Sequence, residues 1–364
     1  MGKRIIGLML LLLALHPAGL GEEELLDAID FSGFSEWTEE AGIDLRDLIL
    51  RVASGDYDPS TGELERALAD SFRKAIVPAK RIFLKILAIG AFSGIGGRFL
   101  SGRFPVVRLL SALTAAALLA GVFAEQIHCV RRVANAASGI SDAALPAAEV
   151  LTAMTGRSHS SALLTPLAAV AAKLMGEGFS GIGIRMACFA AALSVFGSIG
   201  SYVRTDKLYK MIRKGTEWAV GLSLTLFLGA LNINGLLGKS MDATAVQAAR
   251  YAVDHAVPMV GGEMSDAMDS VILSAMHLKN ALGVGCMLLV AASCAGPLLQ
   301  LGMALLAIRL GAAAVEPVAD GAVSAIADGI GGAVEMLLAL AVAATVLSVL
   351  VLGQAMAAGG AVLG

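Results

Sequence analysis

Long apolar blocks separated by short polar connections dominate the chain from residue 82 onward. A helix of about 20 apolar residues is long enough to cross the hydrocarbon core of a bilayer. The blocks that approach or exceed this length predict membrane-spanning helices over residues 82–99, 106–127, 182–202, 217–237, 281–308 and 335–353. A shorter block, 163–176, contains Lys173 and predicts a half-span or a further helix. The pattern therefore predicts an all-α, polytopic integral membrane protein with about six or seven spans.

The overall composition agrees with this class. The chain is 57% hydrophobic and 16% charged, with a mean hydropathy of +0.77, whereas soluble domains carry about 25% charged residues. The sequence has no long basic stripe outside the connections between the apolar blocks. This distribution argues against a nucleic-acid partner.

The N-terminal part of the chain differs from the rest. Two basic residues precede an apolar core at 5–15, which is too short to span a bilayer and is followed by small residues. This pattern predicts a secretory signal peptide over residues 1–21, with an uncleaved anchor as the alternative. Residues 22–81 hold 15 acidic and 7 basic side chains and predict a small extracytoplasmic helical region. The multispan membrane domain then occupies residues 82–364.

Basic residues in the connections predict the orientation of the spans. They cluster at 98–108 and at 204–214, so both connections are expected in the cytoplasm. The acid-rich segment 239–278 is expected on the opposite side. Starting from an external N-terminus, this orientation requires an odd number of crossings between 128 and 202. The 163–176 block is therefore predicted to be re-entrant or interfacial.

Two amphipathic segments, 239–280 and 312–334, interrupt the apolar blocks. In the first, helical spacing gives one apolar face and one face of acids and serines, which is typical of an interfacial helix or of a helix that lines a wet cavity. Five residues of the first segment recur 59 positions later, as Arg250/Arg309, Pro258/Pro317, Gly262/Gly321, Ser265/Ser324 and Asp269/Asp328. Either an internal repeat around a cavity or two separate interfacial helices explains this recurrence.

Side chains for catalysis do not form a recognisable pattern. Residues 234–240 end like a phosphate-binding loop, but Ile233 stands where the first glycine is needed. The four cysteines lack metal-ligand spacing and are predicted to be buried, inert thiols. No catalytic, cofactor or metal site is expected. The glycines within 90–94 and 329–332 predict close helix packing instead.

Several cations fall within or beside the apolar blocks, where an unpaired charge is costly. They are Lys173, Arg185, Lys279 and Arg309. Each should reach the membrane interface or pair with an acid. The preferred ion pair joins Lys279 to Asp269 or to Glu335.

The segment 250–285 resembles the stage III sporulation protein AE family. Ten residues carry this resemblance: Tyr251, Asp254, Pro258, Gly261, Gly262, Ser265, Asp266, Asp269, Lys279 and Asn280. His255 and Ala256 depart from the pattern, because an Asn-Phe-like pair is expected there. From Asp254 onward, these motif residues are the candidates for lining a conduit or contacting partners.

The resemblance implies a component of the SpoIIIA-SpoIIQ channel complex of endospore-forming bacteria. This feeding-tube-like, secretion-like assembly lies in the mother-cell membrane around the forespore and supports late forespore gene expression. Its other members include ring-forming proteins and an ATPase, and this chain would be a multispan component without catalysis of its own. A stand-alone secondary transporter for a small solute or ion, and a passive scaffold for the rings, are the alternatives.

Overall fold

The computed structural model describes residues 26–27, 29–56, 63–100, 105–154, 158–199, 205–256, 261–318 and 321–357, and near several helix ends it describes the backbone alone. Regular structure within these residues is entirely helical. The all-α fold expected from the sequence is therefore confirmed. The predicted signal peptide, 1–21, lies outside the described residues.

Short helices come first, followed by long ones. The short elements are the 3-10 helix η1 (Ser32–Phe34), α3 (Ser35–Ala41) and α4 (Leu45–Ala53). The long elements are α5 (Glu63–Leu100), α6 (Pro105–Met154), α7 (Ser158–Lys173), the π-helix η3 (Leu174–Gly183), α8 (Ile184–Ile199), α9 (Asp206–Ala256), α10 (Gly261–Val315) and α11 (Gly321–Ala357).

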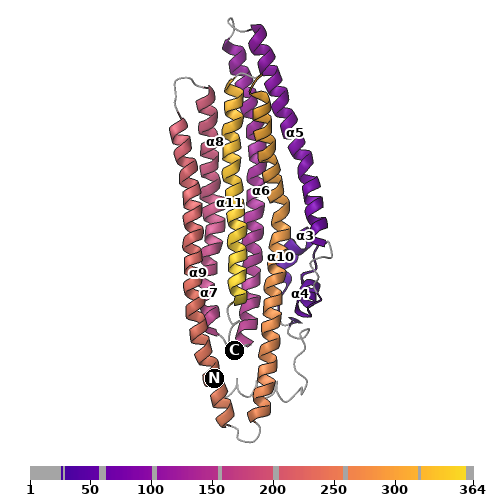
Figure 1. The fold of residues 1–364 in the computed structure, drawn as a ribbon, viewed down its shortest axis with the longest axis vertical. Coiled ribbons are helices and arrows are strands. Elements are labelled where there is room, and N and C mark those ends of the chain that lie inside the picture. The colour runs from indigo at the N-terminus through magenta and orange to yellow at the C-terminus, as the bar shows by residue number, and fades with distance from the viewer. Residues whose placement is uncertain are drawn as a thin grey trace.

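The long helices run side by side as an elongated bundle, with α6, α10 and α11 packed together at its centre (Figure 1). Their facing side chains form one continuous apolar core, in which Ile140 of α6, Leu289 of α10 and Leu337 of α11 are fully buried. Helix α5 packs along α10, while α7, α8 and α9 form the opposite side of the bundle. The central helices are therefore shielded and the outer ones are half exposed.

Helix α4 docks the N-terminal region onto the bundle. The Asp44 carboxylate accepts a hydrogen bond from the backbone N–H of Arg46 at 3.0 Å and caps the helix N-terminus. Leu45 and Ile49 of α4 are buried and face α10 at Gly285, where the missing side chain leaves room for them. Part of the predicted extracytoplasmic region is thus packed against the bundle.

Helix α5 continues from that region into the bundle without a break, so the boundary predicted at residue 81 falls inside a helix. Near the end of its described side chains, α5 approaches α10 closely. A Cβ atom at Gly90 would overlap Val315, and one at Gly94 would meet the carbonyl oxygen of Val318. The close packing predicted from these glycines is confirmed.

Five helices in the described part of the chain are long and apolar enough to cross a membrane. They cover Leu109–Thr152, Thr165–Ser198, Asp206–Ile233, Leu273–Val315 and Gly321–Met356. The multispan class is confirmed, but the span predicted at 82–99 is not among these helices. That block ends at residue 99, and the side chains from 95 onward in α5 lie outside those that the structure describes, so this span stays a prediction.

The prediction for the 163–176 block needs correction. Helix α7 continues through η3 into α8, so the block belongs to the same continuous helical rod as the span predicted at 182–202. The wider π turn ends at Gly183, where a Cβ atom would overlap Leu340 of α11. Between residues 128 and 202, a re-entrant block and a separate span were predicted, but a single rod occupies both. One rod crosses once, which is an odd number, so no re-entrant segment is needed.

The two ends of the bundle differ in charge. The described parts of the basic clusters at 98–108 and 204–214, which are the end of α5 and the starts of α6 and α9, are at one end. The acid-rich segment 239–278 is at the other end (Figure 1). This relative placement agrees with the orientation predicted from the basic connections.

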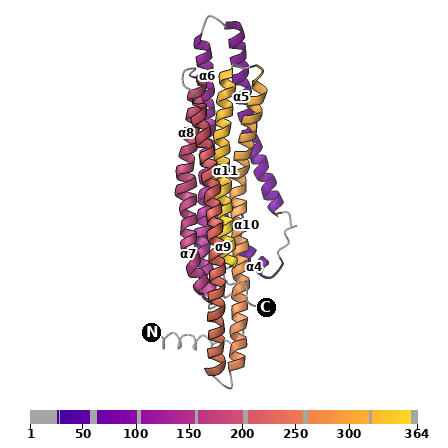
Figure 2. The ribbon, with the colours of Figure 1, turned by 60° about the vertical axis from the view of Figure 1, so that its left-hand side comes forward.

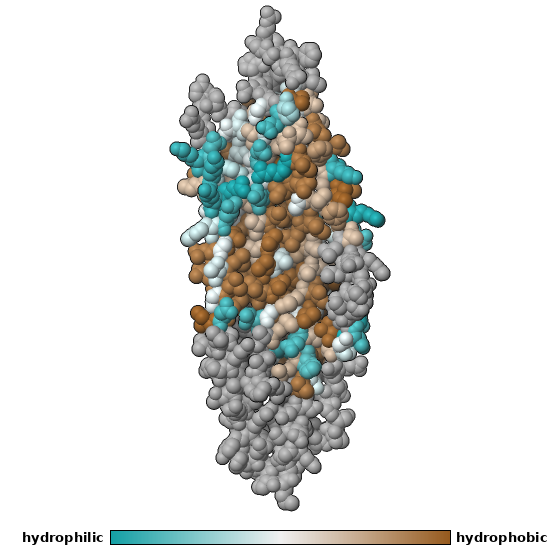
Figure 3. All heavy atoms as spheres, in the orientation of Figure 1, coloured by the Kyte–Doolittle hydropathy of each residue, from teal (hydrophilic) through white to brown (hydrophobic). Residues whose placement is uncertain are grey.

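The helices are longer than a bilayer is thick. The 36-residue span in α11 is about 54 Å long at 1.5 Å per residue, whereas the hydrocarbon core measures about 30 Å. On the face shown in Figure 3, hydrophobic side chains form a broad band with hydrophilic ones gathered above and below it. The bundle therefore extends beyond the membrane.

Candidate functional site

The acid-rich segment 239–278 does not form a single interfacial helix. It supplies the last part of α9 and the first part of α10, and these two helices extend past the other helices as a projecting hairpin (Figures 1 and 2). The second predicted amphipathic segment, 312–334, instead forms the end of α10, a turn and the start of α11. Both segments therefore contribute to two successive helices, and the internal repeat stays a prediction.

The structure divides the candidate motif residues between the projecting hairpin and its base. Asp254 lies in α9, and Gly261, Gly262, Ser265, Asp266 and Asp269 lie in the first turns of α10. Only the backbone is described at these positions, and Pro258 lies outside the described residues. Lys279 and Asn280 follow where α10 enters the bundle, and Asn280 is exposed.

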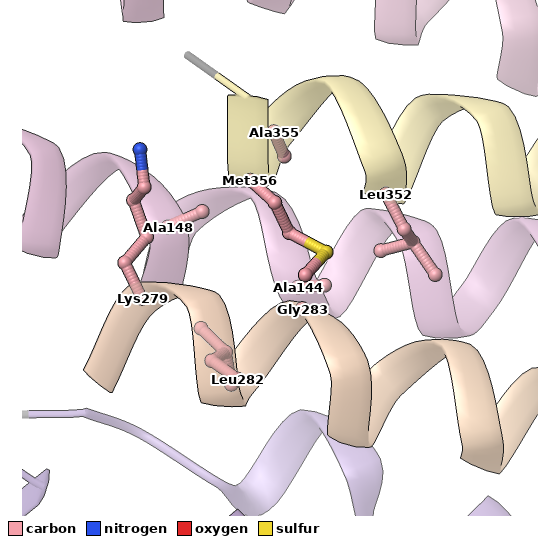
Figure 4. Close-up of a pocket in the computed structure, with 8 residues that line it drawn as sticks. All are labelled: Ala144, Ala148, Lys279, Leu282, Gly283, Leu352, Ala355 and Met356. Atoms are coloured by element: carbon pink, nitrogen blue, oxygen red, sulfur yellow. The ribbon is translucent and has the colours of Figure 1, made fainter. Parts of the chain in front are cut away.

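Lys279 is buried at the base of the hairpin, with only 2% of its surface exposed. Its aliphatic stem borders a small apolar pocket formed by three helices and lined by Ala144, Ala148, Leu282, Gly283, Leu352, Ala355 and Met356. Figure 4 shows the ammonium nitrogen pointing away from α10, toward the end of α11. Lys279, which lies next to an apolar block in the sequence, is thus part of the packing between α6, α10 and α11.

The predicted pair between Lys279 and Glu335 is wrong. Lys279 lies beside Leu352, 17 residues beyond Glu335 on α11, which corresponds to about 26 Å along the helix. Glu335 pairs with two arginines at the other end of the bundle instead. The alternative partner, Asp269, has no described side chain.

Those arginines belong to an ion-pair cluster that joins three helices. Arg213 of α9 contacts Glu335 of α11 at 2.7 Å, and Arg309 of α10 contacts the other oxygen of Glu335 at 2.9 Å. Arg213 also pairs with Glu217 at 2.9 Å, and Arg309 with Asp328 at 3.4 Å. These five side chains remain between 29% and 58% exposed, so water still reaches them.

Tyr209 and two glycines hold the helices together beside this cluster. The Tyr209 hydroxyl donates a hydrogen bond to the carbonyl oxygen of Gly329 at 3.2 Å. A Cβ atom at Gly332 would overlap this hydroxyl, and one at Gly329 would overlap Ser194. The packing role predicted for these glycines is confirmed, and Arg309 has the acidic partners that its position required.

A model of the family described as stage III sporulation protein AE matches residues 43–359. The chain belongs to this family. It is therefore a sporulation protein, and its five candidate spans fit a multi-pass membrane protein.

One curated relative, stage III sporulation protein AE of Bacillus subtilis (strain 168), is 24% identical over 181 residues. This match covers 50% of the present chain and 45% of the Bacillus protein, so it spans less than half of that relative. No solved structure matches the chain.

Within the described residues of this sporulation protein, no group of three or more His, Cys, Asp or Glu side chains could hold a metal ion. Cys129, Cys286 and Cys294 are buried, as expected, whereas Cys188 is half-buried. The ion-pair cluster was not predicted, although the i, i+4 spacing of Arg213 and Glu217 was a local signal for part of it.

Proposed function

We propose that this sporulation protein is the multispan membrane component of a channel complex connecting the mother cell with the forespore. The main observation in support is a membrane bundle from which the family-motif segment projects as a helical hairpin. In this arrangement the bundle crosses the mother-cell membrane, and the hairpin contacts partners outside the bilayer.

The charge of the hairpin favours docking over conduction for the motif residues. Residues 239–272 carry five acids and two arginine or lysine side chains. Because the hairpin extends past the other helices, a path between the bundle helices would not include Asp254, Asp266 or Asp269. Partners with complementary basic surfaces are the expected ligands of the hairpin, and the ring-forming proteins of the complex are the candidates.

Orientation follows from the two ends of the bundle. The basic connections point to the mother-cell cytoplasm and the acidic hairpin to the intermembrane space. Ring-forming proteins would then contact the hairpin, whereas the ATPase would act at the basic end. A stand-alone transporter is the second candidate function, and it would need no such partner.

A pull-down from sporulating cells tests this proposal. The tagged full-length chain is crosslinked in cells, purified in mild detergent and analysed for co-recovered proteins. Recovery of ring-forming proteins and the ATPase supports the channel component. Recovery of the chain alone, with and without crosslinker, contradicts it and favours the transporter.

A charge-reversal variant then locates the docking surface. Asp266→Lys combined with Asp269→Lys should reduce recovery of ring-forming proteins about tenfold, because like charges across an interface cost several kcal/mol. Glu316→Lys, an exposed change at the other end of the bundle, is the matched control and should leave recovery unchanged. Equal recovery with all three chains would contradict docking through the hairpin.

A further inference from the structure

Helix α9 is the least covered of the five candidate spans. In its most apolar stretch 11% of the residues are buried, against 33–56% in the other four spans. Its inner side packs on the bundle through the buried side chains of Phe227 and Leu231. On its outer side an added Cβ atom would meet no neighbouring atom within 4 Å at Gly215, Gly221 or Gly229. Within the described residues, the outer side of α9 is therefore uncovered.

The outer side of α9 changes in character along the helix. It begins with three exposed lysines: Lys207, Lys210 and Lys214. Trp218 follows one turn later and is 71% exposed, and Leu222 and Leu226 come next at 39% and 64%. Spacings of three and four residues keep these positions on one side of the helix. This side, from Lys207 to Ile233, is called the α9 outer face below, and it passes from cationic through aromatic to apolar.

The apolar part of the α9 outer face has the length of a bilayer core. The 21 residues 218–238 contain no Asp, Glu, Lys or Arg, and α9 is helical throughout them. At 1.5 Å per residue they extend about 31 Å, and the hydrocarbon core of a bilayer is about 30 Å thick. Charged residues resume at both ends, with Glu217 and Lys239. A single crossing by this stretch therefore leaves no charge in the hydrocarbon.

The polar side chains within this stretch donate hydrogen bonds to their own helix. The exposed Thr225 hydroxyl donates to the carbonyl oxygen of Gly221 at 2.8 Å. The exposed Asn232 amide donates to the carbonyl oxygen of Leu228 at 3.0 Å. Because no water is present in the bilayer core, polar groups there need partners within the protein. The α9 outer face can therefore meet hydrocarbon without leaving these donors unpaired.

The lysines at the start of the face carry positive charge that the protein does not neutralise. None of them forms an ion pair with a described residue. Glu217, one turn further along α9, contacts Arg213 at 2.9 Å instead. Residues 206–217 hold four cations and two acids, so this section is positive. Lysine side chains extend to the headgroup layer along their aliphatic stems, and tryptophan is enriched at the same layer. Lys214 and Trp218 therefore mark the level of the headgroups.

We propose that the α9 outer face binds anionic phospholipid. Lys207, Lys210 and Lys214 contact the headgroup phosphates, Trp218 lies at the interface, and the acyl chains lie along residues 222–233. Clustered cations beside a membrane span attract anionic headgroups more than zwitterionic ones. Since the basic end of the bundle is expected in the cytoplasm, these headgroups belong to the cytoplasmic leaflet. The inference goes beyond the proposed function, because it holds equally for a channel component and for a stand-alone transporter.

Quenching of tryptophan fluorescence by brominated lipid tests the contact. The chain has two tryptophans, and Trp37 of α3 is half-buried against the Gly139 position of α6. Trp37→Phe leaves Trp218 as the reporter, and Trp218→Phe leaves Trp37 as the matched control. The full-length chains are reconstituted into vesicles of phosphatidylcholine with dibrominated acyl chains. Trp218 should be quenched several-fold more than Trp37, whereas equal quenching would overturn the proposal.

A second set of vesicles tests the choice of headgroup. Each contains equal amounts of phosphatidylglycerol and phosphatidylcholine, and only one of the two lipids is brominated. Because clustered lysines attract anionic lipid, brominated phosphatidylglycerol should quench Trp218 about threefold more than brominated phosphatidylcholine. Equal quenching by the two lipids would overturn the assignment to anionic phospholipid.

A pair of triple variants in the Trp37→Phe background locates the headgroup contact. Lys207→Gln, Lys210→Gln and Lys214→Gln together should abolish the difference between the two brominated lipids. Lys80→Gln, Arg81→Gln and Lys85→Gln remove three exposed cations from α5, and they should leave the difference unchanged. A difference that survives the α9 changes, or that the α5 changes remove equally, would overturn the role of these lysines.

Photocrosslinking in sporulating cells tests for a protein neighbour. Gly221, Thr225 and Gly229 are small residues on the same face, and small residues allow close contact between membrane helices. With benzoylphenylalanine in place of Trp218, the full-length chain should form no adduct with protein. A protein adduct would overturn the assignment of the face to lipid. The proposed function is judged separately on the wild-type chain: co-recovery of partners together with an unquenched Trp218 rejects only this inference.

Discussion

The two ends of the bundle accommodate charge in different ways. At the basic end, Glu335 joins Arg213 and Arg309 in a cluster that spans three helices and stays partly exposed. At the hairpin end, Lys279 is 2% exposed, and its stem packs against small apolar residues. Water can replace a lost partner in the cluster but reaches Lys279 poorly. Substitutions at the hairpin base should therefore cost much more than substitutions in the cluster.

Reversing the buried charge is the strongest test of this difference. Lys279→Glu places a carboxylate where the packing accommodates an ammonium group, and it should reduce the free energy of unfolding by about 3–5 kcal/mol. The measurement is unfolding in mixed detergent–SDS micelles, followed by circular dichroism. Lys279→Met keeps the apolar stem and should cost less.

His277→Glu is the matched control for the added acid. His277 is exposed on the same helix two residues earlier, so this change should alter stability by about 0.5 kcal/mol or less. If Lys279→Glu unfolds at the same SDS fraction as His277→Glu, then Lys279 is not held in the buried setting described above.

The second test changes side-chain volume instead of charge, at the basic end of the bundle. Gly94→Ala adds a Cβ atom that would meet the carbonyl oxygen of Val318, a backbone atom that cannot rotate away. Overpacking of this kind should cost about 1–3 kcal/mol. Unfolding in mixed micelles again provides the readout.

Gly221→Ala provides the comparison for that change. No heavy atom lies within 4 Å of the added Cβ position in α9, so the alanine should stabilise the helix by about 0.5–1 kcal/mol. Equal effects of the two alanines would mean that α5 does not approach the end of α10 as closely as the structure shows.

Hydropathy and glycine spacing predicted much of this architecture. Apolar blocks located five helices able to cross a membrane, and the glycines in 90–94 and 329–332 marked close contacts correctly. The two basic connections were predicted to lie on the same side of the membrane, which agrees with their place at one end of the bundle. Each of these signals is local in sequence, because a helix face or a connection is defined within a few turns.

Features that depend on tertiary contacts were missed. Arg213 and Glu335 are separated by 122 residues, so no local pattern could pair them, and the prediction offered Glu335 as one of two partners of Lys279. The joining of α7 to α8 was missed because Lys173 and Glu177 lower the hydropathy of a helix that simply exposes them.

The ion-pair cluster should show the smallest effect and provides the most informative comparison with Lys279. Glu335→Gln removes the charge shared by two arginines, but these groups are partly solvated, so the loss should be about 1 kcal/mol or less. Glu217→Gln, which removes one partner of Arg213 within the same helix, should cost about 0.3–0.5 kcal/mol. High salt should narrow the gap between wild type and Glu335→Gln, because exposed charges are screened. A loss from Glu335→Gln as large as that from Lys279→Glu, and insensitive to salt, would place the cluster in the dry interior and remove the contrast between the two ends.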